Sequence, residues 1–265
     1  MRSVSQKIKL KLEKKILFNE KLSNYSWFNL GGFSEILFKP DSIADIIFFL
    51  KEIEPKKINI LGAGSNTLIR DGGVDGVTIK LSSKFSYLNF ISPNIIEVGA
   101  ATLDKKIAEY ALEHSLTGLE FLSCIPGSIG GAIKMNSGCY DQEISQILHS
   151  VKTIDLQGNE KVIRASDIRF DYRKSSLRDD LIITSVKLQG KKSIKSEIQN
   201  KQQNLLEKKK KSQPSQIKTC GSTFKNPKNK KAWELIKDSN CHTFNVGDAR
   251  ISDKHFNFFV NGGNA

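Results

Sequence analysis

Short apolar runs recur along the chain, each about as long as one strand and bounded by polar or glycine-containing segments. Runs of this length between turn residues are typical of buried strands. The pattern predicts strands over residues 58–61, 77–81, 95–98, 151–156 and 181–188.

Two segments between these runs have helical periodicity instead. Asp41 and Ser42 precede the sequence IADIIFFLKEI, and Asp45 follows Ser42 at the three-residue spacing of a capping box. Thr102 stands in the same way before LDKKIAEYALEH, whose apolar residues fall on one helical face. Helices and strands mixed in this way predict the α+β class.

The composition changes after the last of these runs. Residues 190–212 are rich in Lys, Gln, Glu and Ser with a few spaced apolar residues, which predicts a polar helix that joins two lobes. We expect a large region over residues 1–190 with subdomains of about 1–82 and 83–190, a linker helix over 191–214, and a smaller lobe over 215–265.

The charge of the chain limits its partners. The 265 residues carry a net charge of +13, much of it in lysine runs such as residues 208–211, which are also typical of a solvated helix face. Most aromatic residues are Phe within apolar runs and do not alternate with basic residues, as they would in a stacking platform for nucleic acid. The composition therefore favours small anionic ligands, with no nucleic acid.

The sequence predicts neither a transmembrane helix nor a secretory signal. Its apolar runs are far shorter than the roughly 20 residues of a transmembrane helix. The first 15 residues lack the apolar centre and cleavage site of a secretory signal. We therefore expect a cytoplasmic protein with no membrane partner.

The four cysteines, Cys124, Cys139, Cys220 and Cys241, are far apart in the sequence and form no CxxC pair. This spacing argues against a disulfide framework and against a zinc site, and we expect reduced thiols and no metal. Cys220 stands close to Ser222, but no sequence signature supports a nucleophilic role for it.

A loop of small residues follows the first predicted strand. Residues 62–66 read GAGSN, and such residues let successive backbone N–H groups approach phosphate oxygens. The Rossmann fingerprint fails because Thr67 replaces its third glycine, and no Gly-Lys-Ser/Thr completes a P-loop. By itself this loop is equally compatible with a structural turn.

A second loop, over residues 125–131, reads IPGSIGG and is followed by AIKMNSGCY. The density of glycine and small polar residues is hard to explain by a single turn. Two such loops about sixty residues apart would suit one long dinucleotide held between two subdomains.

A third segment, residues 219–227, reads TCGSTFKNP. It places Ser222 between Gly221 and the pair Lys225–Asn226, which makes the hydroxyl a candidate proton donor beside anion-binding groups. Gly-Ser-Thr and Asn-Pro are also ordinary turn sequences, so the alternative is a structural turn.

Six blocks of sequence, taken in order, carry a specific similarity that extends from about residue 27 to the last residue. The blocks are WFNLGG (Trp27–Gly32), LGAGSNTLIRDGGVDGV (Leu61–Val77), GLEFLSCIPGSIGGAIKMNSG (Gly118–Gly138), FDYRKSSL (Phe170–Leu177), GSTFKNP (Gly221–Pro227) and SDKHFNFFVN (Ser252–Asn261). Together they resemble the UDP-N-acetylenolpyruvoylglucosamine reductases, flavoproteins of cell-wall precursor synthesis.

The resemblance implies an FAD-binding fold of the vanillyl-alcohol-oxidase and p-cresol-methylhydroxylase type. In this fold two α+β subdomains hold FAD, and a smaller α+β lobe covers the substrate. The implied reaction has two halves: NADPH reduces FAD, and the reduced flavin passes hydride to the enolpyruvyl C3 of a UDP-sugar, which gives UDP-N-acetylmuramate. The resemblance thus implies FAD as cofactor, NADPH as co-substrate, anionic substrates and a monomer.

The resemblance also implies roles for single residues. Arg173 would stabilise the enolate, because a guanidinium is permanently charged and pairs bidentately with a carboxylate. Ser222 would donate the proton to C2. Lys225 and Asn226 would bind the substrate together with Arg173 and Ser222. His255 is expected to be structural. The residues expected to contact FAD are Gly62, Ala63, Gly64, Ser65, Asn66, Ile125, Pro126, Gly127, Ser128, Gly130 and Gly131.

The sequence departs from the family pattern in three places. Family members carry a further catalytic glutamate beyond the position of Ala265. We therefore expect NADPH to reduce bound FAD, and the transfer of hydride from reduced FAD to the substrate to be impaired. Glycines that are frequent in the family are replaced by other residues over residues 238–242. The tyrosine-bearing insert of one subgroup is absent, so the chain is more similar to the shorter subgroup. A non-catalytic flavin-binding protein and another oxidoreductase of the same fold are the alternatives.

Overall fold

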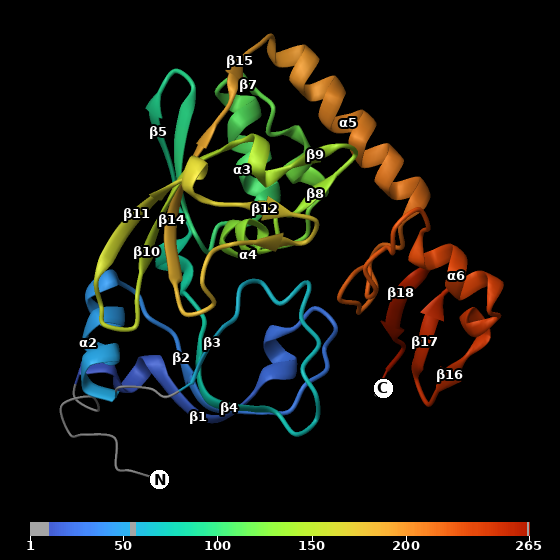
Figure 1. The fold of residues 1–265 in the computed structure, drawn as a ribbon, viewed down its shortest axis with the longest axis horizontal. Helices are drawn as coiled ribbons and strands as arrows, with labels where there is room; N and C mark the ends of the chain where they lie inside the picture. The colour runs from blue at the N-terminus through green and yellow to red at the C-terminus, as the bar shows by residue number, and fades with distance from the viewer. Residues whose placement is uncertain (1–10, 54–56, 264) are drawn as a thin grey trace.

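The computed structural model describes residues 11–53, 57–263 and 265. It contains two larger sheets, a long exposed helix and a small C-terminal sheet (Figure 1). Most of the N-terminal sequence that was judged not to be a secretory signal lies outside the described residues. None of the helices in the described ranges is long and apolar enough to cross a membrane.

The first sheet combines one antiparallel and two parallel pairings, in the order β1-β2-β4-β3. Helix α2 packs against it around a buried core, in which the rings of Phe38 and Phe49 stack with centroids 4.0 Å apart. The elements are β1 (Ile16–Lys21), β2 (Phe33–Phe38), α2 (Ile43–Ile53), β3 (Ile58–Ile60) and β4 (Val74–Ile79).

The predicted capping box of α2 is confirmed. The backbone N–H of Asp45 donates to Ser42 Oγ at 3.1 Å, and the N–H of Ser42 donates to Asp45 Oδ2 at 3.2 Å. Lys15 Nζ donates to the same carboxylate oxygen at 2.6 Å and joins the helix to the residue directly before β1. Burial alone would raise the pKa of Asp45, but these bonds keep it below its usual value.

The second sheet is antiparallel, in the order β11-β10-β14-β6-β5. Helices α3 and α4 pack against it, and its core is the largest apolar cluster of the described residues. Its strands are β5 (Leu88–Ser92), β6 (Ile95–Gly99), β10 (Leu148–Ile154), β11 (Glu160–Arg164) and β14 (Ile182–Gln189), and its helices are α3 (Asp104–Glu113) and α4 (Ile129–Lys134). Each of the strands and helices predicted from the sequence overlaps an observed element of the same type.

One detail of the prediction is wrong. The residue that caps α3 is Leu103, which makes no side-chain cap, whereas Thr102 Oγ1 donates to the Tyr87 carbonyl at 3.2 Å. Leu103 forms a β-bridge with Ser128, so the chain enters α3 in a strand-like conformation that this long-range pairing imposes.

Helix α5 (Lys195–Ser212) is the predicted polar helix. It is exposed except near Ile198 and Gln202, and the Gln202 side chain donates to the Ala108 carbonyl of α3 at 2.9 Å. The chain then forms α6 (Ala232–Asp238) and an antiparallel sheet of β16 (Asn245–Val246), β17 (Ala249–Ser252) and β18 (His255–Asn261).

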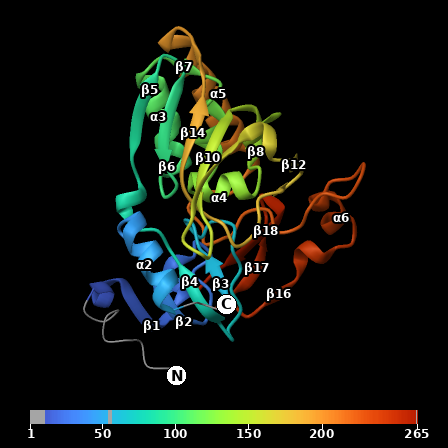
Figure 2. The same cartoon turned by 60° about the vertical axis from the view of Figure 1, so that its left-hand side comes forward.

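The C-terminal sheet lies beside the loops that connect the strands of the first sheet (Figure 2). Asn261 Nδ2 donates to the Phe28 carbonyl at 3.1 Å and joins β18 to the N-terminal region. Three two-stranded pairings complete the fold: β7 (Leu116–Thr117) with β15 (Lys191–Lys192), β8 (Gly138–Cys139) with β9 (Gln142–Glu143), and β12 (Phe170–Asp171) with β13 (Lys174–Ser175).

Candidate functional site

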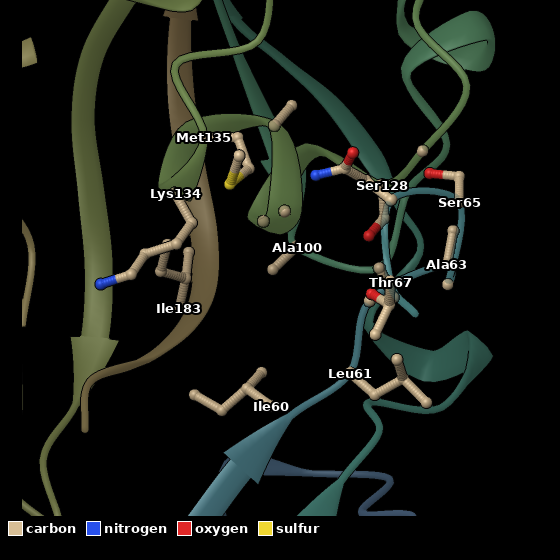
Figure 3. Close-up of a pocket in the computed structure, with 18 of the residues that line it drawn as sticks. Ile60, Leu61, Ala63, Ser65, Thr67, Ala100, Ser128, Lys134, Met135 and Ile183 are labelled. Atoms are coloured by element: carbon tan, nitrogen blue, oxygen red, sulfur yellow. The ribbon is translucent and has the colours of Figure 1, made fainter. Parts of the chain in front are cut away.

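A cavity of about 660 Å³ lies between the first sheet and the loop that leads into α4. This volume is typical of a site for a small molecule or cofactor. Ser65 lies beside Ser128 on one side of the cavity, and Lys134 lies on the opposite side (Figure 3). The lining includes every residue predicted to contact FAD: Gly62, Ala63, Gly64, Ser65, Asn66, Ile125, Pro126, Gly127, Ser128, Gly130 and Gly131.

The two glycine-containing loops meet directly in this cavity. Ser65 Oγ donates to the Pro126 carbonyl at 2.5 Å, and Ser65 Oγ also lies 3.3 Å from where a Cβ on Gly127 would stand. Residues 61 positions apart in the sequence are therefore in contact, as the dinucleotide hypothesis requires.

Glycine is required at Gly64 for two reasons. Its φ of +74° lies in the left-handed region, and a Cβ there would come within 2.0 Å of the Tyr25 carbonyl oxygen. The close approach is fixed by a hydrogen bond from the Trp27 N–H to the Gly64 carbonyl at 3.0 Å. This loop is therefore a structural turn, which does not exclude a role in ligand binding.

The same loop also has unused donors. Among the described residues, the backbone N–H groups of residues 62–67 donate to no protein acceptor, although Gly64 and Ser65 are buried. The N–H groups of Gly127 and Ser128 are also unused. Buried backbone donors are almost always paired in folded proteins, so this cradle fits an anionic ligand such as a pyrophosphate.

Lys80 is a site residue that the sequence analysis missed. Because β3 and β4 are parallel neighbours, their carboxyl ends lie at one edge of the sheet, and Lys80 directly follows β4 as the GAGSN loop follows β3. Lys80 lines the cavity and its Nζ donates to the Gly62 carbonyl at 2.5 Å. The useful signal would have been a lysine at the end of the neighbouring parallel strand.

The charge of Lys80 has no acidic partner within the described ranges. Burial lowers the pKa of its ammonium, and the positive charge of Lys39 lowers that pKa further. A partly buried cation without a counter-ion is costly, and an anion in the cavity would compensate it. Lys134 differs, because it already forms an ion pair with Asp179 at 2.8 Å.

Asp104 is a buried carboxyl group among the residues that line this cavity. Its side chain is 0 % exposed, and neither carboxyl oxygen has a hydrogen-bond partner among the described residues. Burial raises the pKa of this carboxyl well above its usual value and so disfavours its charged form.

Arg173 and Ser222 lie together outside the lining of this cavity. Arg173 occupies the turn between β12 and β13 with a φ of 56°, and its Nη2 donates to the Ser222 carbonyl at 3.0 Å. The contact uses the backbone of Ser222, and among the described residues the Ser222 hydroxyl makes no hydrogen bond. Both side chains are half-buried, so a ligand could reach them.

The neighbouring Lys225 and Asn226 differ in their surroundings. Lys225 is exposed, whereas Asn226 Oδ1 accepts a hydrogen bond from the Ala232 N–H at the start of α6, at 3.0 Å. The backbone N–H of Asn226 donates to the Tyr172 hydroxyl at 3.4 Å. Asn226 therefore has a structural task in addition to the predicted binding role.

The remaining candidates make local contacts. His255 Nδ1 accepts a hydrogen bond from the Asn257 N–H at 3.2 Å, and burial lowers the pKa of the imidazole. Burial also raises the pKa of the Cys220 thiol, which disfavours a nucleophilic role. All four cysteines are free, and Cys139 Sγ donates to the Phe121 carbonyl at 3.5 Å.

Comparisons with known proteins agree with this geometry. A family model described as "FAD binding domain" matches residues 34–166, and one described as "UDP-N-acetylenolpyruvoylglucosamine reductase, C-terminal domain" matches residues 213–265. The predicted α+β, FAD-binding fold with an additional C-terminal domain is thereby confirmed.

Individual relatives cover nearly the whole chain. It is 47% identical over 264 residues to the UDP-N-acetylenolpyruvoylglucosamine reductase of Pelagibacter ubique (strain HTCC1062), which covers 98% of this chain and 87% of that protein. The enzyme of the same name from Orientia tsutsugamushi (strain Ikeda) is 43% identical over 251 residues, covering 93% and 83%. The crystal structure of UDP-N-acetylenolpyruvylglucosamine reductase from Thermus caldophilus superposes with a TM-score of 0.84 at 33% identity, covering 94% of this chain and 88% of that one. The chain therefore belongs to the UDP-N-acetylenolpyruvoylglucosamine reductase family.

Proposed function

We propose that this protein uses FAD and NADPH to reduce UDP-N-acetylglucosamine enolpyruvate to UDP-N-acetylmuramate, a step of peptidoglycan precursor synthesis. The observation that carries the proposal is the cavity with unused backbone donors in two loops and an uncompensated lysine. Family membership, with relatives that bear this reductase name, supports the choice of substrate.

The proposed FAD site consists of the two loops and Lys80. The unused N–H groups of residues 62–67 and those of Gly127 and Ser128 would bind the pyrophosphate, and Lys80 would neutralise part of its charge. FAD, when bound, supplies the hydride transfer that protein side chains cannot perform. The contribution of the chain is to hold it between the two sheets and to exclude water.

The proposed catalytic pair is Arg173 and Ser222. One guanidinium nitrogen of Arg173 is bound to the Ser222 carbonyl, which fixes the side chain and leaves further N–H donors for a carboxylate. Arg173 would stabilise the negative charge that develops on the substrate after hydride reaches C3. The free hydroxyl of Ser222 would then protonate C2, while Lys225 and Asn226 bind the anionic groups of the substrate.

The division into residues 1–190, 191–214 and 215–265 stays a proposal, as do a monomeric state and a cytoplasmic location. The division is supported by the exposed helix α5, which separates the second sheet from the C-terminal sheet along the chain.

Anaerobic mixing tests the proposed function directly. The purified protein should take up FAD and turn yellow, NADPH should bleach the flavin, and the enolpyruvyl substrate should restore its colour. A preparation that cannot take up FAD would contradict both half-reactions. Reduction of the flavin by NADPH without reoxidation by the substrate would contradict the second half-reaction.

A further inference from the structure

Asn257 is a buried residue of β18 whose side chain holds the segment that follows Ser222. The side chain is only 3 % exposed. Asn257 Oδ1 accepts a hydrogen bond from the Phe224 N–H, and Asn257 Nδ2 donates to the Phe224 carbonyl, both at 2.9 Å. One side chain therefore pairs with both polar backbone groups of Phe224, as a residue of a neighbouring antiparallel strand does.

The backbone of β18 holds the residues that precede Phe224. The Asn257 carbonyl accepts a hydrogen bond from the Thr223 N–H at 2.9 Å. Ser222 forms a β-bridge with Phe258. The Asn257 side chain thus extends this pairing by one residue and fixes the direction in which the chain leaves Ser222.

The Phe224 carbonyl has a second donor, the guanidinium of Arg173. Arg173 Nη1 donates to this carbonyl at 3.5 Å, and Arg173 Nη2 donates to the Ser222 carbonyl at 3.0 Å. Arg173 and Phe224 are 51 positions apart in the sequence, so the contact joins the turn between β12 and β13 to the C-terminal lobe. Because Asn257 orients an acceptor that Arg173 uses, its hydrogen bonds affect both residues of the proposed catalytic pair.

Apolar packing holds this segment only weakly. The Phe224 side chain is 51 % exposed, and its ring meets the ring of Phe259 edge-on with centroids 5.8 Å apart. Thr223 and Lys225, on either side of Phe224, are exposed as well. Buried apolar area therefore contributes little to the order of this segment, and its hydrogen bonds with Asn257 determine its position.

We propose that Asn257 is a positioning residue for the second half-reaction, because it holds both backbone groups of Phe224 and so fixes Ser222 and the Arg173 guanidinium relative to each other. The inference rests on the proposed function, in which Arg173 and Ser222 act on the substrate. A displacement of a reacting group by about 1 Å can lower a rate about 100-fold. Reduction of FAD by NADPH uses neither residue, so it should not depend on Asn257.

Stopped-flow measurements on the FAD-loaded full chain test this separation of the two half-reactions. Asn257→Ala removes both hydrogen bonds to Phe224, whereas Asn257→Asp keeps the size of the side chain and an acceptor but loses the N–H donor. In both variants, reoxidation of the flavin by saturating substrate should slow at least about tenfold, while reduction by NADPH changes less than about threefold. The solvent deuterium isotope effect on reoxidation should also rise, since proton transfer from a misplaced Ser222 limits the rate.

Val260→Ala is the matched control. Val260 is buried in the same strand, and its replacement removes apolar groups without removing a hydrogen bond. Both half-reactions of this variant should stay within about threefold of the wild type. If Val260→Ala slows reoxidation as much as Asn257→Ala does, general loosening of the C-terminal lobe explains the result and the proposal is overturned. Equal slowing of both half-reactions in Asn257→Ala, or unchanged reoxidation, would overturn it too.

Hydrogen exchange of the full chain provides a measurement that does not depend on turnover. The Phe224 N–H donates to the Asn257 side chain, so its exchange should speed up at least roughly tenfold in Asn257→Ala and stay unchanged in Val260→Ala. Unchanged exchange at Phe224 would contradict the positioning role. If the wild type takes up FAD but the substrate does not reoxidise it, the proposed function fails, and the exchange rate alone decides whether Asn257 holds this segment.

Discussion

Replacing Lys80 with Gln should weaken FAD binding strongly while leaving the apoprotein at least as stable as the wild type. The lysine is partly buried, its pKa is lowered by burial and by Lys39, and it has no acidic partner within the described ranges. Removing it from the apoprotein relieves an uncompensated charge. Removing it from the complex loses one charge-assisted contact, which is worth about 1.5–3 kcal/mol or roughly a 10- to 100-fold rise in Kd.

The assay is a titration of apoprotein with FAD that is monitored through the quenching of flavin fluorescence. Riboflavin serves as a comparison ligand. Riboflavin lacks the pyrophosphate, so its Kd should change less than about threefold in Lys80→Gln. Lys80→Arg should retain most of the FAD affinity because it keeps the charge. Lys84→Gln is the matched control, since Lys84 is exposed, belongs to the same segment and does not line the cavity.

Two further measurements sharpen this prediction. Binding requires the protonated lysine, so FAD affinity should fall as the pH rises through the lowered pKa of Lys80, and this dependence should vanish in Lys80→Gln. Equal weakening of FAD and riboflavin would refute the assignment to the pyrophosphate, and an unchanged FAD affinity would refute any role for the lysine in cofactor binding.

Three other substitutions have defined outcomes. Gly64→Ala should lower the free energy of unfolding by about 1–3 kcal/mol in denaturant titrations and abolish FAD uptake, because φ is +74° and the Tyr25 carbonyl blocks the new Cβ; a stable, yellow variant would contradict this. Ser222→Ala should leave flavin reduction by NADPH unchanged in stopped-flow measurements and slow reoxidation by substrate at least about 100-fold, and unchanged reoxidation would exclude the proton-donor role. Asp45→Ala should lower the free energy of unfolding by about 1 kcal/mol near pH 7, since the bonds that Asp45 Oδ2 accepts from the Ser42 N–H and from Lys15 are lost. Because the pKa of Asp45 is lowered in the folded state, that difference should disappear as the pH falls below about 4, and a difference that persists in acid would contradict its electrostatic origin.

Much of the local structure could be predicted from the sequence. The capping box of α2 and the strand-length apolar runs were assigned correctly because they depend on residues only a few positions apart. The glycine-containing loops were also recognisable, since Gly64 must adopt a left-handed conformation that few other residues tolerate. Their spacing suggested that they share one dinucleotide, and the resemblance to the reductase family then implied FAD.

The tertiary structure alone decided which distant residues meet. The parallel pairing of β3 with β4 brings Lys80 to Gly62, 18 positions away, and the packing of β8 on the 3₁₀ helix Glu120–Cys124 brings Cys139 to the Phe121 carbonyl. The bridge between Leu103 and Ser128 likewise overrode the local capping signal of Thr102. Local signals fix helices, turns and strands because the interacting groups are covalently close, whereas the charge balance of the cavity depends on strand pairing that no short window of sequence contains.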